Sequence, residues 1–151
     1  MARVWAAHPL HPPLTDITIG AHTTAALLAV ASAMGLSEAR TAHGWWLALL
    51  VGLLASIPTG ASGLIDFLAL GPEHPARPAA IRHLLLVLPT YPAFVSAVLL
   101  GHAGYVRGTI DTAPLALTLA GFTLLAGAGF AGGRLVFRAG LRVKRQQDRK
   151  Q

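Results

Sequence analysis

Four long apolar segments, separated by short polar stretches, dominate the sequence. They run over about residues 14–36, 45–70, 79–100 and 113–136. Each is close to the roughly 20 residues that an α-helix needs to cross the hydrocarbon core of a bilayer. None of them alternates apolar and polar residues as a transmembrane strand does. Because backbone groups in lipid must find their hydrogen bonds within the chain, the pattern predicts four transmembrane helices.

The polar stretches between these helices are short, at 37–44, 71–78 and 101–112. Short links place consecutive helices side by side and antiparallel. The expected fold class is therefore all-α, an up-down bundle of four transmembrane helices. One integral membrane domain would cover residues 1–145, and residues 146–151 would form a basic tail.

Small residues recur at four-residue spacing, a pattern that lets helices approach closely in lipid. The stripes are Ala21, Ala25, Ala29 and Ala33, then Gly52, Ser56 and Gly60, and finally Gly129 and Gly133. Pro58, Pro89 and Pro92 should kink the second and third helices. Segment 59–70 can also be laid over 127–138, which suggests two related halves. Each half would pair a helix that enters with a histidine and a glycine-rich helix that returns.

The composition agrees with a membrane protein. Hydrophobic residues make up 54% of the 151 positions and charged residues only 12%, whereas soluble domains carry about 25% charge. The chain has no cysteine, which excludes disulfides, thiolate metal sites, iron–sulfur clusters and covalently attached haem. No nucleophile–base motif, phosphate loop or metalloprotease spacing is present, so we expect no catalytic residues.

The distribution of basic residues predicts an orientation. Ten of the twelve lie on the side that holds both termini and the second link, and seven of them fall in the last eighteen positions. By the positive-inside rule, both termini should be cytoplasmic, in a bacterial inner membrane. Trp45 and Trp46 would then anchor the second helix at the outer interface. The basic tail would contact anionic lipid headgroups rather than nucleic acid.

Ionisable side chains inside membrane helices are costly, so they are candidates for function. The set in or beside the predicted helices comprises His11, Asp16, His22, Asp66, Arg82 and His83. With a rise of about 1.5 Å per residue, all of them fall in the predicted cytoplasmic half of the bundle. Proline follows both His8 and His11, which favours an extended lead that could fold over the end of the bundle.

Two imidazoles from different helices could bind the iron of a b-type haem, as in other helical bundles. His83 would be one ligand, and His22 or His11 the other. Asp66 and Arg82 would hold an imidazole tautomer or a haem propionate. Such a subunit would pass electrons to a redox partner protein. The alternative is a non-catalytic structural or assembly subunit. A proton or metal pathway is disfavoured, because no polar trail continues through the outer half.

Four motifs, taken together, resemble a bacterial membrane-protein family called domain of unknown function 2231. They are HPLHPPLTDITIG at 8–20, TGASGLIDF at 59–67, RPAAIRHLLL at 77–86 and GGRLVF at 132–137. The resemblance implies a four-helix membrane domain, and a redox setting, since members are sometimes joined to Rieske-type or cytochrome-type modules. The motif residues carried over are His11, Pro12, Gly63, Asp66, His83, Gly132 and Gly133. The resemblance therefore favours His11 as the partner of His83, whereas helix depth favours His22.

Overall fold

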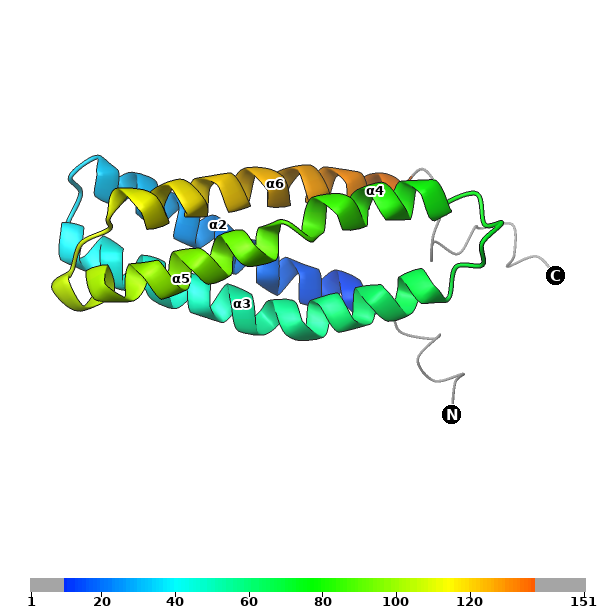
Figure 1. The fold of residues 1–151 in the computed structure, drawn as a ribbon, viewed down its shortest axis with the longest axis horizontal. Coiled ribbons are helices and arrows are strands. Elements are labelled where there is room, and N and C mark those ends of the chain that lie inside the picture. Colours follow the sequence, from blue (N-terminus) through cyan, green and yellow to red (C-terminus); the bar gives the residue numbers. More distant parts are fainter. Residues whose placement is uncertain (1–9, 138–151) are drawn as a thin grey trace, which may run out of the picture.

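The computed structural model describes residues 10–137 and is helical almost throughout (Figure 1). The helices are α2 (His11–Ala33), α3 (Glu38–Leu68), α4 (Arg77–Val87), α5 (Thr90–Arg107) and α6 (Thr112–Phe137). No strand occurs within this range. Four stretches are long and apolar enough to cross a membrane, with α4 and α5 together forming the third. The predicted all-α fold with four membrane-crossing stretches is confirmed.

The helices run up and down along one long axis (Figure 1). At one end of the bundle α2 and α4 begin and α3 and α6 end; we call it the His11 end. The links at 34–37 and 108–111 lie at the opposite end. Helix α3 packs on α2 and α5, and α6 packs on α5, α4 and α2. The third stretch therefore lies diagonally across the bundle from α2.

The links are shorter than the sequence suggests, because helices extend into the polar stretches. Helix α3 begins at Glu38, seven residues before the predicted start at Trp45, and α5 continues to Arg107. Gly35 and Gly108 adopt φ values of 77° and 76° in the two links at the opposite end. Glycine suits this left-handed conformation because it has no Cβ to clash with the backbone.

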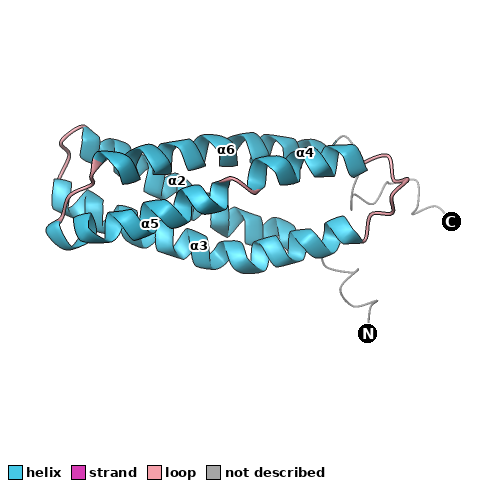
Figure 2. Cartoon of the chain, in the orientation of Figure 1, coloured by secondary structure: helices cyan, strands magenta, loops and turns pink. Residues whose placement is uncertain are grey.

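Pro89 marks an interruption in the third stretch. Helix α4 ends at Val87 and α5 begins at Thr90, and Figure 2 shows the short link between them. Proline lacks the N–H that would continue the helical ladder, so a break at this point is expected. Pro58, in contrast, lies inside α3 without ending it. Pro92 lies in the first turn of α5, where a missing N–H costs nothing.

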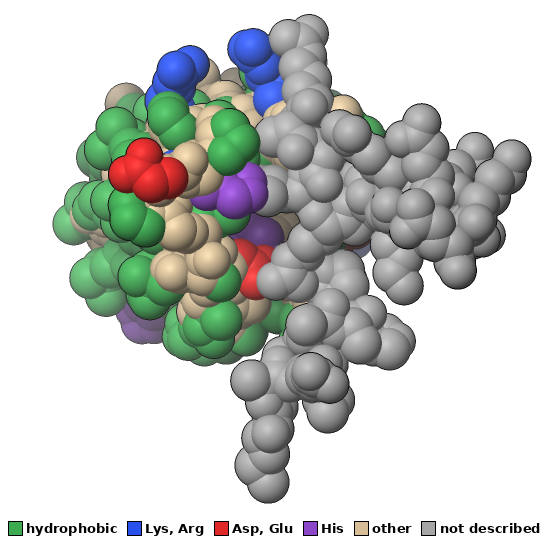
Figure 3. All heavy atoms as spheres, turned by 90° about the vertical axis from the view of Figure 1, so that its right-hand side faces the viewer, with side chains coloured by type: hydrophobic (Ala, Val, Ile, Leu, Met, Phe, Trp, Pro, Cys, Tyr) green, Lys and Arg blue, Asp and Glu red, His purple; other side chains and the backbone are tan. Residues whose placement is uncertain are grey.

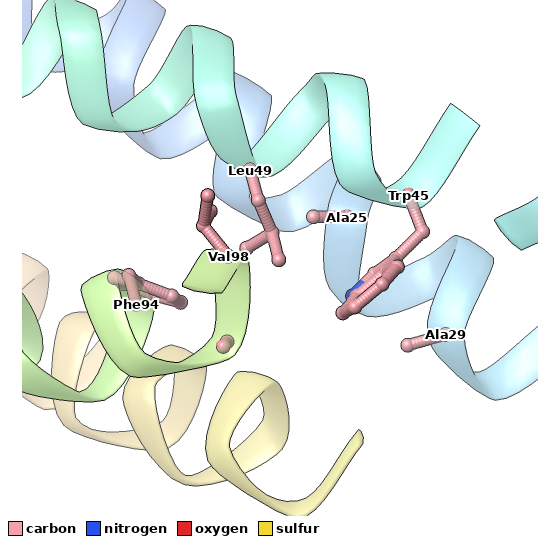
Figure 4. Close-up of a cluster of buried hydrophobic side chains, with 7 residues drawn as sticks. Ala25, Ala29, Trp45, Leu49, Phe94 and Val98 are labelled. Carbon is pink, nitrogen blue, oxygen red and sulfur yellow. The ribbon is translucent and has the colours of Figure 1, made fainter. Parts of the chain in front are cut away.

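The main apolar core lies between the middle of the bundle and the opposite end. Trp45, Leu49, Phe94, Val98, Ala25 and Ala29 form most of it (Figure 4). Trp45 is fully buried, and its Nε1 donates a hydrogen bond to Thr118 Oγ1 at 3.0 Å. The prediction that Trp45 anchors the helix at the interface is therefore wrong. The indole needs close contact with Gly101, where an added Cβ would clash with the ring.

The outer surface of the bundle is strongly apolar. Large side chains that are more than half exposed include Leu27, Leu54, Ile57, Leu99 and Phe130. A soluble monomer rarely exposes so much contiguous apolar surface, whereas lipid tails would cover it without cost. The surface therefore agrees with the length and composition of the helices.

A candidate two-histidine site at the His11 end

His11 lies in the first turn of α2 and turns inward toward α3. Its Nδ1 is 3.0 Å from the carbonyl oxygen of Thr59 and 3.3 Å from Ser62 Oγ. The prolines that follow it occupy the first helical turn, where an N–H has no helical partner in any case. The expected extended geometry at His11 is therefore wrong. His8 lies outside the described residues.

Gly63 makes room for the His11 ring against α3. A Cβ placed on Gly63 would lie 2.7 Å from His11 Cε1 and 3.0 Å from Nδ1. Contacts this short are repulsive, so any side chain at position 63 would push the imidazole away. Thr59 and Gly63 are one helical turn apart on the same face. One turn of α3 thus supplies both the hydrogen-bond acceptor and the space.

His83 on α4 is held by α6 in the same way. Its Nδ1 is 2.9 Å from the carbonyl oxygen of Ala128. A Cβ on Gly132, one turn further along α6, would lie 3.2 Å from His83 Cε1. The acceptor and the glycine are again four residues apart. Two different helix pairs therefore hold their imidazoles by the same device.

The hydrogen bonds define which nitrogen of each imidazole remains available. A carbonyl oxygen only accepts, so Nδ1 carries the proton and donates it in both His11 and His83. Nε2 then keeps a free lone pair, which is the arrangement found in most metal-ligating histidines. Both rings lie toward the same end of the bundle, since His11 opens α2 and His83 lies on α4, which begins at that end. Figure 3 looks onto this end of the bundle, where histidine side chains lie near the centre of the face.

His22 lies deeper along α2 and belongs to the core instead. It is 1% exposed and stacks on Phe94, with ring centroids 3.8 Å apart and an angle of 4° between the planes. On its other side, a Cβ at Gly52 would come within 2.6 Å of the ring. The imidazole is thus enclosed between a phenyl ring and a helix backbone. Its buried Nδ1 has no hydrogen-bond partner among the described residues.

The charged candidates are spread over the same end of the bundle. Asp16 and Arg82 are exposed, and Asp66 is half-buried near the end of α3. The backbone carbonyls of Thr59 and Ala128 accept the imidazole hydrogen bonds. The role of Asp66 and Arg82 toward an imidazole tautomer or a haem propionate stays a prediction. Within residues 10–137, no three or more histidine, aspartate or glutamate side chains are grouped to hold a metal ion. Any iron between these imidazoles would need its remaining ligands from a cofactor or from outside residues 10–137.

Sequence reasoning missed the two carbonyl acceptors, because a carbonyl leaves no mark in the sequence. The glycines gave a partial signal. Gly63 and Gly132 stood in the family motifs, but the four-residue stripe drew attention to Gly129 and Gly133 instead. At Gly133 an added Cβ would meet nothing within 4 Å. The other indication was the repeat, in which a helix that enters with a histidine is followed by a glycine-rich helix that returns.

A helical bundle with an apolar outer surface and polar groups gathered near one end defines an integral membrane protein. The sequence matches the family described as "Predicted membrane protein (DUF2231)" over residues 7–145, and the chain belongs to that family. No curated protein and no solved structure matches the chain. The family resemblance seen in the motifs is confirmed.

Proposed function

We propose that this protein is a small redox-associated membrane subunit that holds a b-type haem between His11 and His83. The observation that carries the proposal is the shared state of the two imidazoles. Each donates Nδ1–H to a backbone carbonyl, and no residue within 10–137 forms a hydrogen bond with its Nε2. The two rings come from two different membrane-crossing stretches and lie at the same end of the bundle.

The donor set fits haem better than it fits a bare metal ion. A structural zinc site takes four protein ligands, and no group of three or more suitable side chains occurs within residues 10–137. A haem supplies four nitrogens of its own and needs two axial ligands from the protein. Two neutral imidazoles with free Nε2 atoms meet that need. His22 does not, since Gly52 and Phe94 enclose its ring.

The protein residues would fix the axial ligands and tune their strength. The carbonyls of Thr59 and Ala128 hold each ring in one tautomer and make Nε2 a stronger donor. Gly63 and Gly132 set how far each ring stands from its helix. A bound haem would supply one-electron transfer, and its potential would depend on these axial ligands and on the apolar surroundings. Electrons would pass to a redox partner protein.

We also propose on which side of the membrane the two-histidine site lies. The distribution of basic residues favours the cytoplasmic side of a bacterial inner membrane for the His11 end. The site would then lie near the cytoplasmic surface, within reach of a soluble partner. The basic residues at 138–150 lie outside the described residues; we propose that they contact anionic headgroups beside the site.

A second candidate function is structural, and the same hydrogen bonds favour it. His11 ties α2 to α3, and His83 ties α4 to α6, whether or not a ligand is bound. Interhelical hydrogen bonds of this kind stabilise membrane bundles by about 0.6 kcal/mol on average. On this account the protein would be a non-catalytic assembly subunit, and its polar end would lock the helices together.

A reduced-minus-oxidised absorption spectrum separates the two. The protein is purified in mild detergent after haem-supplemented expression, and dithionite is the reductant. The haem proposal predicts a shifted Soret band with sharp α and β bands, weakened in both His11→Ala and His83→Ala. The matched control is His22→Leu, which should keep the wild-type spectrum. A featureless spectrum in the wild type would rule out the haem proposal and leave the structural function.

A further inference from the structure

The two halves of the chain share a pattern of contacts between a ring and a glycine. His11 packs on Gly63, and His83 packs on Gly132. In the same way, His22 packs on Gly52 and Phe94 packs on Gly121. These two pairs of contacts relate α2 to the third stretch and α3 to α6.

The correspondence has a constant register. The first-helix positions are related by 72 residues, 11 to 83 and 22 to 94, and the second-helix positions by 69, 52 to 121 and 63 to 132. The hydrogen-bond acceptors agree, since residue 59 corresponds to 128. The overlay of 59–70 on 127–138 was therefore wrong by one residue. Position 66 corresponds to 135, a leucine, rather than to Arg134.

The repeat also has an axis. Helix α2 and the third stretch run in the same direction and lie diagonally across the bundle, which is the relation that a two-fold axis along the bundle produces. His22 and Phe94, which correspond to one another, stack face to face on each other. Two residues related by a two-fold axis lie on opposite sides of it, so they can touch only when both lie next to the axis. Across this level the order is Gly52, His22, Phe94 and Gly121.

We infer that the two-histidine site is a single site on this pseudo-two-fold axis. One half comes from α2 and α3, and the equivalent half comes from the third stretch and α6. Each half consists of an imidazole, a carbonyl and a glycine: His11, Thr59 and Gly63, or His83, Ala128 and Gly132. Its ligand would have two equivalent opposite faces and would bridge the halves. The inference rests on the proposed function for the ligand itself, a planar haem, but the equivalence of the halves does not depend on it.

The equivalence makes Gly63 and Gly132 positioning residues, and it requires His11 and His83 to contribute equally. His11→Ala and His83→Ala should weaken hemin binding by factors that agree within about threefold. Gly63→Ala should weaken it about tenfold or more, as loss of the support around a ligand does. Gly132→Ala should weaken it less, since the added Cβ lies 3.2 Å from the ring rather than 2.7 Å. Gly133→Ala and Gly20→Ala, which meet nothing within 4 Å, are the controls.

A second readout needs no ligand. In nitrogen-15 spectra of histidine-labelled, haem-free protein, His11 and His83 should show the same tautomer, protonated at Nδ1. Gly63→Ala should shift the signals of His11 alone, and Gly132→Ala those of His83 alone. Opposite tautomers, or loss of hemin binding in one histidine variant but not the other, would overturn the two-fold site. Absence of hemin binding in the wild type would overturn the haem proposal. The nitrogen-15 spectra would still show whether His11 and His83 are equivalent.

Discussion

At the scale of single residues, glycine determines where the aromatic rings of this bundle can lie. Gly52, Gly63 and Gly101 each have a ring so close that an added Cβ would overlap it. In lipid there is no hydrophobic force between helices, so such close approach supplies much of the packing energy. These glycines therefore contribute through the absence of a side chain rather than through backbone freedom.

Gly52→Ala tests this reading directly. The new Cβ would come within 2.6–2.8 Å of three atoms of the His22 ring, and neither the ring nor Phe94 behind it has space to move. We expect the free energy of unfolding to fall by about 1–3 kcal/mol, as for overpacked cores. Circular dichroism during thermal unfolding in detergent would measure it. Gly127→Ala is the control, since its Cβ would meet nothing within 4 Å. Equal stability of the two variants would contradict the packing account.

His22→Leu tests the unpartnered nitrogen in the core. The substitution loses the stack on Phe94, worth about 0.5–1.5 kcal/mol. It also removes a buried nitrogen that has no hydrogen-bond partner within residues 10–137, and such an atom costs about 1–3 kcal/mol. The variant should therefore unfold at the wild-type temperature or above it. A clear drop in the unfolding temperature would show that His22 makes a stabilising polar contact in the membrane.

At the scale of elements, threonine hydroxyls connect α2 to α3. Thr59 Oγ1 is 2.9 Å from Thr18 Oγ1 and 3.1 Å from the carbonyl oxygen of Leu14, with both threonines buried. On α2 this link lies one to two turns after His11, and it sets how α2 meets α3. The same turn of α3 thus fixes both the helix pair and the imidazole.

Thr59→Val should loosen this helix pair while preserving its shape. It removes the hydroxyl that reaches Thr18 and Leu14, and each such bond contributes about 0.5–1.5 kcal/mol. We expect a loss of about 1 kcal/mol in the free energy of unfolding, measured by thermal denaturation. Thr24→Val is the control, since Thr24 is exposed and bonds only to its own helix. A loss of the same size at Thr24 would show that the interhelical bond contributes nothing.

The break between α4 and α5 has a consequence for the site. Pro89 lets α4 run along α6 in its own direction, and α4 is the helix that carries His83. Pro89→Ala restores a backbone N–H and favours one continuous helix. We expect the His83 contact with Ala128 to weaken and hemin affinity to fall, as measured by titration. Pro92→Ala, in the first turn of α5, should leave the affinity unchanged. Unchanged hemin affinity in Pro89→Ala would show that the helix break is not needed to position His83.

At the scale of the whole molecule, the expected orientation is testable because the natural chain has no cysteine. Single cysteines at Leu36 and Glu73, both exposed and in links at opposite ends, can be labelled selectively. With the His11 end in the cytoplasm, a membrane-impermeant maleimide should label Leu36→Cys in intact spheroplasts. Glu73→Cys should react only after the membrane is broken. The reverse pattern would place the two-histidine site on the outer side.

The fold could be predicted from the sequence because the length of an apolar segment indicates whether it can form a membrane-spanning helix. The four segments were located, and the main errors were at links such as 37–44, where polar residues continue the helix. For the site, the motifs pointed to His11 and His83, but depth along the helix pointed to His22. Depth takes no account of direction: His22 faces Phe94, and only tertiary packing places those rings together. The one-residue register of the repeat also required contacts, since glycine and alanine align equally well at several offsets.

Electron paramagnetic resonance of the oxidised protein would show whether His11 and His83 are the two axial ligands of one haem, as we propose. We expect a low-spin, bis-imidazole ferric signal in the wild type and in His22→Leu. Each of His11→Ala and His83→Ala should convert it to a high-spin signal, because one axial ligand is lost. A low-spin signal that survives in either variant, or that disappears in His22→Leu, would contradict the claim.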